Sequence, residues 1–144
     1  DLNQLIATTC HLIEAECSHG LTIEQRLDQL PQLAGYPAKI SQALYNVLDN
    51  ATKAICSPDG RVRITSRVAE NGCCEVMVED NGCGVSSDHI DRLFDPFFTT
   101  RPVGSGTGLG LSVARDIMTA HRGEILVRSK LGAGTRVTLR FLSQ

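Results

Sequence analysis

Near the middle of the chain, one set of side chains has the types and the spacing needed to hold a metal ion and a phosphate group. The set consists of Gln42, Asn46, Asn50 and Lys53. Intervals of three and four residues bring all of them to one face of a helix. A carboxamide oxygen can ligate a hard cation such as Mg²⁺, and an ammonium group one turn away can neutralise phosphate oxygens. A solvated helix face is the alternative interpretation of this pattern.

The run Asp80-Asn81-Gly82-Cys83-Gly84 has the features of a binding turn for a flat ligand. It follows directly on a predicted strand, so the carboxylate of Asp80 projects from the strand end and can accept a hydrogen bond from an exocyclic amine such as that of adenine. Gly82 and Gly84 allow the backbone to approach such a ligand closely. A plain Asn-Gly turn is the alternative. Cys83 is expected to be a small buried packing residue, with a thiol open to modification as the other interpretation.

Four glycines at every second position, from Gly104 to Gly110, stand just before a predicted helix. Backbone N–H groups collect on an anion at a helix start, so this loop is expected to bind phosphate. It is not a Walker loop, because no Gly-Lys-Ser/Thr follows, and a dinucleotide-binding loop would need a strand before it. A flexible linker is the alternative.

Three of the four phenylalanines lie just before these glycines, in the segment Phe94-Asp95-Pro96-Phe97-Phe98-Thr99-Thr100-Arg101. Irregular stretches as long as the one from Phe94 to about Thr107 are uncommon unless they are functional or mobile. Aromatic side chains beside a basic residue suggest a lid that docks over a bound nucleotide. Anchoring of the loop in the core is the alternative.

Hydrophobic periodicity and turn residues predict the elements that must position these side chains. The predicted helices cover residues 1–18, 37–55, 86–93 and 109–121, and the predicted strands cover residues 21–27, 62–68, 75–79, 124–129 and 135–141. Pro37 suits the first turn of its helix, and Gly123 is expected to stop the last helix. His121, near that helix end, is expected to be a capping or core residue. The second and third strands are predicted to be antiparallel, and helices and strands together predict a two-layer domain.

The bulk composition limits the classes of protein to which the chain can belong. It has 144 residues, of which 42% are hydrophobic, which fits one globular domain over residues 1–144. A formal net charge of −2 gives no global positive field for nucleic acid or an anionic membrane. The six cysteines lack metal or disulfide-scaffold spacing, which favours reduced thiols in a cytoplasm. The chain has no leader-like segment and no membrane-spanning apolar run, and its start without Met favours a domain of a longer protein.

Taken in order, the four segments resemble the asparagine box, first glycine box, phenylalanine box and second glycine box of the ATP-binding domain of sensor histidine kinases. The resemblance spans about residues 37–142, the motif-bearing core. It extends to the superfamily that shares the Bergerat nucleotide site with gyrase, heat-shock chaperones and mismatch-repair ATPases. It implies an α+β fold, a two-layer α/β sandwich in which about three helices cover one face of a mixed, mainly antiparallel sheet. It also implies ATP and Mg²⁺ as cofactors.

Carried over residue by residue, the resemblance assigns roles within this site. Asn50 matches the Mg²⁺-binding asparagine, with Asn46 beside it as a second metal ligand. Lys53 matches a phosphate-contacting position, and Asn50 and Lys53 are the catalytic candidates. Asp80 matches the adenine-reading aspartate, and Thr135 resembles a late-strand threonine that supports adenine recognition. The other candidate nucleotide-binding residues are Gly82, Gly84, Phe94, Phe98, Arg101, Gly106, Thr107, Gly108, Leu109 and Gly110.

One position bears on the type of reaction. In the ATPase branches of the superfamily a glutamate lies one turn before the metal-binding asparagine, where it can act as general base on water. This chain has Asn46 there, and an amide has no useful basicity. The γ-phosphoryl group is therefore expected to be kept for another acceptor. In histidine kinases that acceptor is a histidine followed by Glu or Asp, whereas the four histidines here are followed by Leu, Gly, Ile and Arg.

The resemblance thus implies the catalytic part of a two-component sensor kinase. Its partners would be the histidine-containing dimerisation domain, upstream in the same kinase, and indirectly the receiver domain of a response regulator. The fragment itself is expected to be monomeric and cytoplasmic, or the cytoplasmic part of a membrane-bound sensor. An anti-sigma-type serine kinase is one alternative, against which the phenylalanine-rich segment and the run from Gly106 to Leu111 count. A non-enzymatic partner-binding module is the other, and the intact Asn50 and Asp80 count against it.

Overall fold

The structure, a computed structural model, describes residues 1–17, 21–55, 59–90, 92–95 and 110–142. Its elements are, in chain order, α1 (Leu2–Glu16), β1 (Ile23–Leu27), α2 (Pro37–Ala54), β2 (Val62–Val68), β3 (Cys74–Asp80), α3 (Ser87–Ile90), α4 (Gly110–Ala120), β4 (Glu124–Lys130) and β5 (Gly134–Phe141). Every predicted element is present. The third helix is shorter than predicted, because the hydrogen bonds that follow it span three residues, as from Arg92 N to His89 O at 2.9 Å, and form turns.

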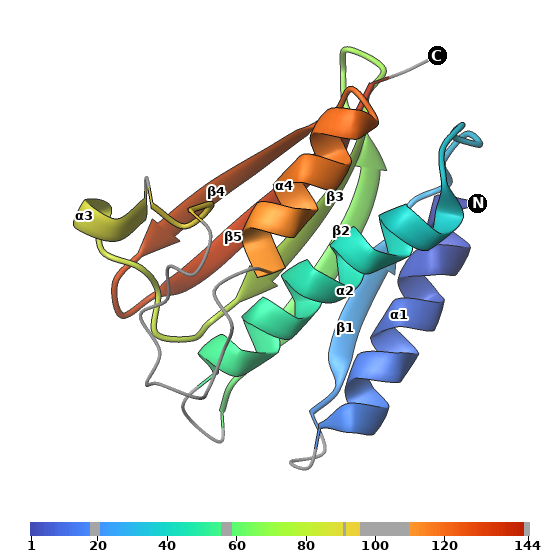
Figure 1. Ribbon diagram of the computed structural model, residues 1–144. Coiled ribbons are helices and arrows are strands. Elements are labelled where there is room, and N and C mark those ends of the chain that lie inside the picture. The colour runs from blue at the N-terminus through green and yellow to red at the C-terminus, as the bar shows by residue number, and fades with distance from the viewer. Residues whose placement is uncertain (18–20, 56–58, 91, 96–109, 143–144) are drawn as a thin grey trace.

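The five strands form one sheet in the order β1-β2-β3-β5-β4. β1 and β2 pair in parallel through a crossover that contains α2, and the other three pairs are antiparallel. The helices α1, α2 and α4 lie side by side over one face of this sheet (Figure 1). The predicted two-layer α+β architecture, with a mixed and mainly antiparallel sheet under about three helices, is therefore confirmed.

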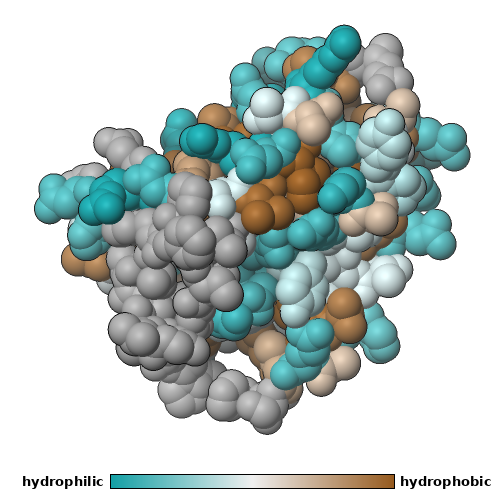
Figure 2. Space-filling view, viewed as in Figure 1, coloured by the Kyte–Doolittle hydropathy of each residue, from teal (hydrophilic) through white to brown (hydrophobic). Residues whose placement is uncertain are grey.

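The core lies between these helices and the sheet, and α2 contributes most to it. Its buried residues are Ile40, Ala43, Leu44, Val47, Leu48 and Ala51, and they pack in one cluster with the inward side chains of β2, β3 and β5. The outward surface of the helical layer is largely hydrophilic, and its most extended hydrophobic patch lies near α2 and α4 (Figure 2). Burial of the apolar stripe fixes the rotation of α2, and with it the direction of the carboxamide-bearing face. None of the described helices has both the length and the apolar character that crossing a bilayer requires.

The end of α4 differs in one detail from the prediction. The left-handed position falls on Arg122, with φ of 58°, rather than on Gly123. Gly123 is needed for a different reason, since a Cβ on it would lie 2.5 Å from the carbonyl oxygen of Arg140 on β5. His121 caps this region as predicted. Its Nε2 accepts a hydrogen bond from Tyr36 N at 3.1 Å, and its Nδ1 lies 2.9 Å from Ile117 O, which ties the end of α4 to the start of α2.

A row of alternating charges crosses the sheet face opposite the helices. Strand register aligns Arg67, Glu75, Arg140 and Glu124. Only 4% of the Glu75 side chain is exposed, and its carboxylate oxygens lie 3.0 Å from Arg67 and 2.8 Å from Arg140. Burial alone raises the pKa of Glu75, but the hydrogen bonds and charges of Arg140 and Arg67 outweigh it and leave this pKa below its ordinary value.

Glu75→Gln should therefore destabilise the protein by about 2 kcal/mol at pH 7, because two arginines lose a charged acceptor. A carboxyl whose folded pKa is depressed contributes stability above its unfolded pKa and loses this contribution as the pH falls through the folded value. The difference between wild type and variant, measured by urea unfolding, should thus shrink as the pH is lowered to about 3. Glu79→Gln is the control, since Glu79 forms one ion pair among the described residues, with Arg136 at 3.2 Å, and is more exposed. A pH-independent Glu75 effect would contradict the ionic explanation.

Candidate nucleotide-binding site

Three polar side chains form a row on the helix-facing side of the sheet. Asp80, the last residue of β3, is the register partner of Thr135 on β5, and Thr135 is the partner of Ser129 on β4. Asp80 and Ser129 each end an alternation of buried or half-buried apolar residues, as with Val76 and Val78 before Asp80, and Thr135 begins one on β5. All three side chains therefore point to the inward face of the sheet. Asp80 and Thr135 are therefore together, as the sequence predicted, while Ser129 was not among the predicted site residues.

Asp80 is held as a partly buried acceptor. Its Oδ1 accepts a hydrogen bond from Gly82 N at 2.9 Å. Burial raises the pKa of the Asp80 carboxyl, and the backbone N–H groups of Gly82 and Thr135 act in the opposite direction without cancelling this effect. A ligand that donates a hydrogen bond would replace part of the lost solvation. The side chain is thus suited to binding an exocyclic amine.

The turn after Asp80 is wedged against the end of α2. Cys83 N donates to Ala54 O at 3.1 Å, and a Cβ on Gly82 would lie 2.2 Å from the same oxygen. Gly84 has φ of 71°, and a Cβ there would lie 2.1 Å from Lys130 O. Within the described structure, close approach of the protein's own backbone requires both glycines. Asp80 and the C-terminal turn of α2 are positioned together by this contact.

Asn81 braces the same turn, a role that the sequence did not predict. Its Oδ1 accepts from Arg61 N at 2.6 Å, and its Nδ2 donates to Asp59 O at 3.1 Å. Cys83, next to the buried Gly82, is exposed. The expectation that Cys83 is a buried packing residue is therefore wrong, because Gly82 takes the inward place in the turn.

Gly82→Ala should separate the turn from α2 and destabilise the nucleotide-free protein by about 2–3 kcal/mol, since the added methyl meets a backbone oxygen that cannot rotate away. This corresponds to a decrease in melting temperature of roughly 5–10 °C in calorimetry. Gly132→Ala is the control. Gly132 has φ of 83° with no atom within 4 Å of an added Cβ, so only backbone strain of about 1 kcal/mol is expected. Equal losses in the two variants would argue against the contact with Ala54.

The carboxamide face of α2 is available for a ligand. Asn46 and Asn50 are half-buried, and neither side chain hydrogen-bonds to any residue that the structure describes. A Cβ on Gly110, the first residue of α4, would lie 3.9 Å from Cβ and O of Asn46, so the N-terminus of α4 lies beside this face. Uncommitted amide oxygens next to a helix N-terminus fit a hard cation with anionic ligands.

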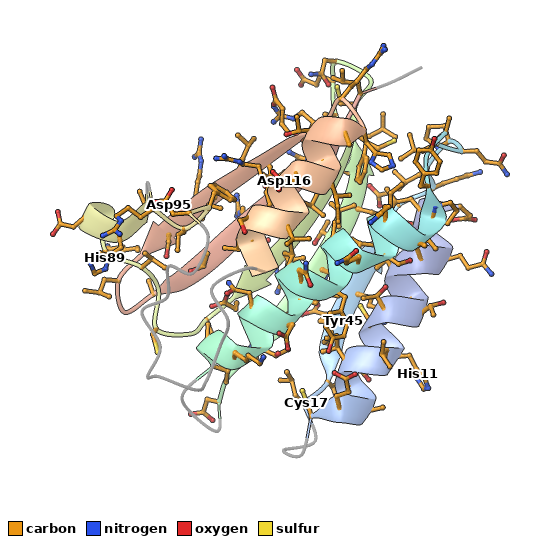
Figure 3. The ribbon with its side chains drawn as sticks, viewed as in Figure 1. His11, Cys17, Tyr45, His89, Asp95 and Asp116 are labelled. Atoms are coloured by element: carbon orange, nitrogen blue, oxygen red, sulfur yellow. The ribbon has the colours of Figure 1, made fainter. Side chains whose placement is uncertain are left out.

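Lys53, unlike Asn46 and Asn50, already has a partner within the protein. Its Nζ lies 2.9 Å from Asp49 Oδ2 in an (i, i+4) pair, and both residues line a cavity of about 460 Å³ between α1 and α2. Tyr45 projects from α2 toward α1 in this region, with Cys17 at the end of α1 (Figure 3). Exposed helical pairs of this kind contribute only about 0.3–0.5 kcal/mol. Breaking the Lys53–Asp49 pair would therefore cost little free energy, which leaves Lys53 able to contact a phosphate.

Phe94 lies against the core and under α4. It is half-buried, packs on the central cluster, and has the Arg115 guanidinium carbon 5.4 Å from its ring centroid. Phe94 thus helps to anchor this segment to the core, whereas its predicted contact with a nucleotide stays a prediction. The remaining predictions for this segment and the second glycine run fall outside the described residues; they concern Phe97, Phe98, Arg101, Gly104, Gly106, Thr107, Gly108 and Leu109.

Comparison with known proteins agrees with this geometry. The family model described as "Histidine kinase-, DNA gyrase B-, and HSP90-like ATPase" matches residues 35–144. The signal transduction histidine-protein kinase AtoS of Escherichia coli K12 is 36% identical over 145 residues, which cover 96% of this chain and 22% of AtoS. The sensor histidine kinase ZraS of the same strain is 35% identical over 142 residues, covering 96% of this chain and 30% of ZraS. The chain thus spans less than a third of the length of these relatives.

Solved structures give the same result. The catalytic domain of the histidine kinase ThkA in a nucleotide-free form superposes with a TM-score of 0.82 at 28% identity, covering 97% of this chain and 92% of that domain. Full-length ShkA in complex with AMPPNP superposes with a TM-score of 0.85 at 26% identity, covering 98% of this chain and 30% of ShkA. Since the family model covers most of the chain and both relatives are more than 30% identical over 96% of it, the chain belongs to the histidine kinase-, DNA gyrase B- and HSP90-like ATPase family.

Proposed function

We propose that this chain, residues 1–144, is the ATP-binding catalytic domain of a two-component sensor histidine kinase and forms part of a longer cytoplasmic or membrane-anchored protein. It binds MgATP and presents the γ-phosphoryl group to a histidine on a separate dimerisation domain, from which a receiver domain takes it. The observation that carries the proposal is the position of Asp80 relative to Asn46 and Asn50. The two asparagine amides, to which no described residue hydrogen-bonds, lie one to two helical turns before Ala54, where the turn that follows Asp80 contacts α2. The names of the relatives support it.

The described residues favour transfer to a protein acceptor over hydrolysis. Asn46 has no basicity, and Asp49, its neighbour in the same helix, is paired with Lys53. No carboxylate is thus offered to a water molecule by this part of α2. Mg²⁺, when bound, would neutralise phosphate charge, with Asn50 and Asn46 as its protein ligands. The domain then contributes orientation and charge stabilisation rather than acid–base chemistry.

The acceptor histidine is proposed to lie on another domain. His121 is committed through both ring nitrogens to Tyr36 and Ile117. His11 projects from α1 and His89 from α3, at opposite ends of the molecule (Figure 3). Neither is followed by an acidic residue. Because these histidines do not match an acceptor, the fragment alone is proposed not to phosphorylate itself. We also propose that it is a monomer that binds nucleotide.

Calorimetric titration with ATP and ADP, each with and without Mg²⁺ and with GTP as control, tests the binding step. We expect adenine-selective binding that responds to Mg²⁺. Absence of binding by the folded protein would overturn the proposal and favour a partner-binding module. Phosphotransfer is tested in the longer protein with labelled ATP, where an acid-labile phosphoryl group supports histidine as acceptor. An acid-stable product would instead support the serine kinase alternative.

A further inference from the structure

Ser129 occupies the end of the inward row on β4, where the preceding inward positions are the apolar Ile125 and Val127. Its hydroxyl has three neighbours within hydrogen-bond distance. Val85 N lies at 2.7 Å, Gly134 O at 2.9 Å and Thr135 Oγ1 at 2.8 Å. One half-buried hydroxyl thus joins the turn after Gly84, the start of β5 and the side chain of Thr135.

Counting protons assigns a direction to each of these bonds. A hydroxyl has one proton to donate and two lone pairs that accept. The Val85 N–H can only donate and the Gly134 carbonyl can only accept, so Ser129 receives the first bond and gives its proton to the second. Its remaining lone pair can only accept, which makes Thr135 the donor in the bond between the two hydroxyls. The Thr135 oxygen is then left with lone pairs and no proton for a ligand.

The side chains of Asp80 and Thr135 consequently both present hydrogen-bond acceptors, and no donor, to a ligand beside them. Asp80 and Thr135 are register partners, and the Asp80 carboxylate is also an acceptor when ionised. A purine with a 6-amino group, or a water molecule that points its protons at these residues, satisfies both. A purine with a 6-oxo group places a third acceptor there and leaves buried acceptors unpaired, which is the strongest basis for discrimination between similar ligands.

We propose that Ser129 is a positioning residue for base selectivity, which fixes the hydroxyl of Thr135 as an acceptor and so favours 6-amino over 6-oxo purines. This inference rests on the proposed nucleotide-binding function and on adenine lying at Asp80. Ser129 acts through Thr135 and does not itself touch the base. Loss of its hydroxyl frees the Thr135 proton, and Thr135 can then donate to a 6-oxo group.

The test compares the dissociation constants of ATP and inosine triphosphate, which carries an oxo group in place of the 6-amino group, for wild type and Ser129→Ala. The dissociation constant of inosine triphosphate divided by that of ATP should be about fivefold smaller in the variant than in wild type. A change of this size corresponds to the free energy of one redirected hydrogen bond. Ser129→Thr keeps the hydroxyl and should restore most of the ratio. In a Thr135→Val background, Ser129→Ala should no longer change it.

Several outcomes would overturn the inference. Equal weakening of both nucleotides by Ser129→Ala, or an unchanged ratio, would mean that Ser129 only holds the turn. Nuclear magnetic resonance of the unmutated protein gives a measurement that needs no variant, since the Thr135 hydroxyl proton should be protected from exchange and a freely exchanging proton contradicts the assignment. A wild-type protein that binds no adenine nucleotide would overturn the proposed function together with this inference, whereas selective wild-type binding with an unaffected variant removes the inference alone.

Discussion

Asp80→Asn should weaken ATP binding about 100-fold and leave the nucleotide-free protein almost as stable as the wild type. The asparagine oxygen can still accept from Gly82 N, which the Asp80 Oδ1 binds at 2.9 Å. Its amino group, however, replaces an acceptor with a donor and opposes the donor on adenine. Burial raises the pKa of the Asp80 carboxyl. At pH above the unfolded pKa, the ionised group therefore costs folding free energy, and removal of its charge does not destabilise the fold.

The measurement combines calorimetric titration with thermal unfolding of the same samples. Glu79→Gln makes the same chemical change one residue earlier, on the opposite face of β3, and serves as the control. A melting temperature that collapses in Asp80→Asn, or an equal loss of ATP and residual GTP binding, would indicate general unfolding instead of lost base recognition. ATP binding by the wild type should also weaken as the pH falls toward the raised pKa of Asp80, because the protonated carboxyl offers one acceptor fewer.

The elements of this fold were predictable wherever the signal lies within one element. The stripe from Ile40 to Ala51 repeats at helical spacing, so its burial and the direction of Asn46 and Asn50 follow from the sequence alone. The same holds for the alternation of Val62, Ile64 and Ser66 on β2, all of which are buried. Asp80 was predicted at a strand end because the strand and the turn are adjacent in the chain.

Features that depend on strand register were missed. Ser129 lies opposite Thr135 only because the turn between β4 and β5 pairs Lys130 with Gly134, and sequence periodicity does not specify that pairing. A serine at the third inward position after Ile125 and Val127 was the signal that could have identified it. The pairing of Glu75 with arginines on both neighbouring strands was missed for the same reason. These contacts join residues from separate strands.

Other differences come from packing against the ends of helices. The role of Gly82 in seating the turn on Ala54 needs the position of α2 relative to β3, which no local pattern contains. At the end of α4 the left-handed conformation likewise falls on Arg122, whereas Gly123 is required by its close approach to β5. In both cases the sequence identified the glycine but not its contact. Gly82 was expected to approach a ligand and Gly123 to stop a helix, whereas each lies against a backbone oxygen of the protein itself.

Asn50→Ala has the largest expected effect on the reaction. In the longer protein it should reduce phosphoryl transfer from MgATP about 10²–10³-fold, because the metal loses a protein ligand and the phosphates lose their orientation. Binding of ADP without Mg²⁺ should change less than about threefold, since Asp80 and Thr135 still hold the base. The fold should not be affected, as no described residue hydrogen-bonds to the Asn50 side chain.

Gln42→Ala is the matched control for Asn50→Ala, because Gln42 shares the carboxamide face of α2 but lies two turns earlier and is not a candidate metal ligand. It should leave transfer and Mg²⁺ dependence unchanged. Titration of both variants with ADP and ATP, with and without Mg²⁺, separates metal binding from base binding. A loss of ADP affinity in Asn50→Ala without Mg²⁺ would mean that Asn50 shapes the pocket directly. An unchanged Mg²⁺ response would mean that another residue holds the metal and would contradict the role proposed for Asn50.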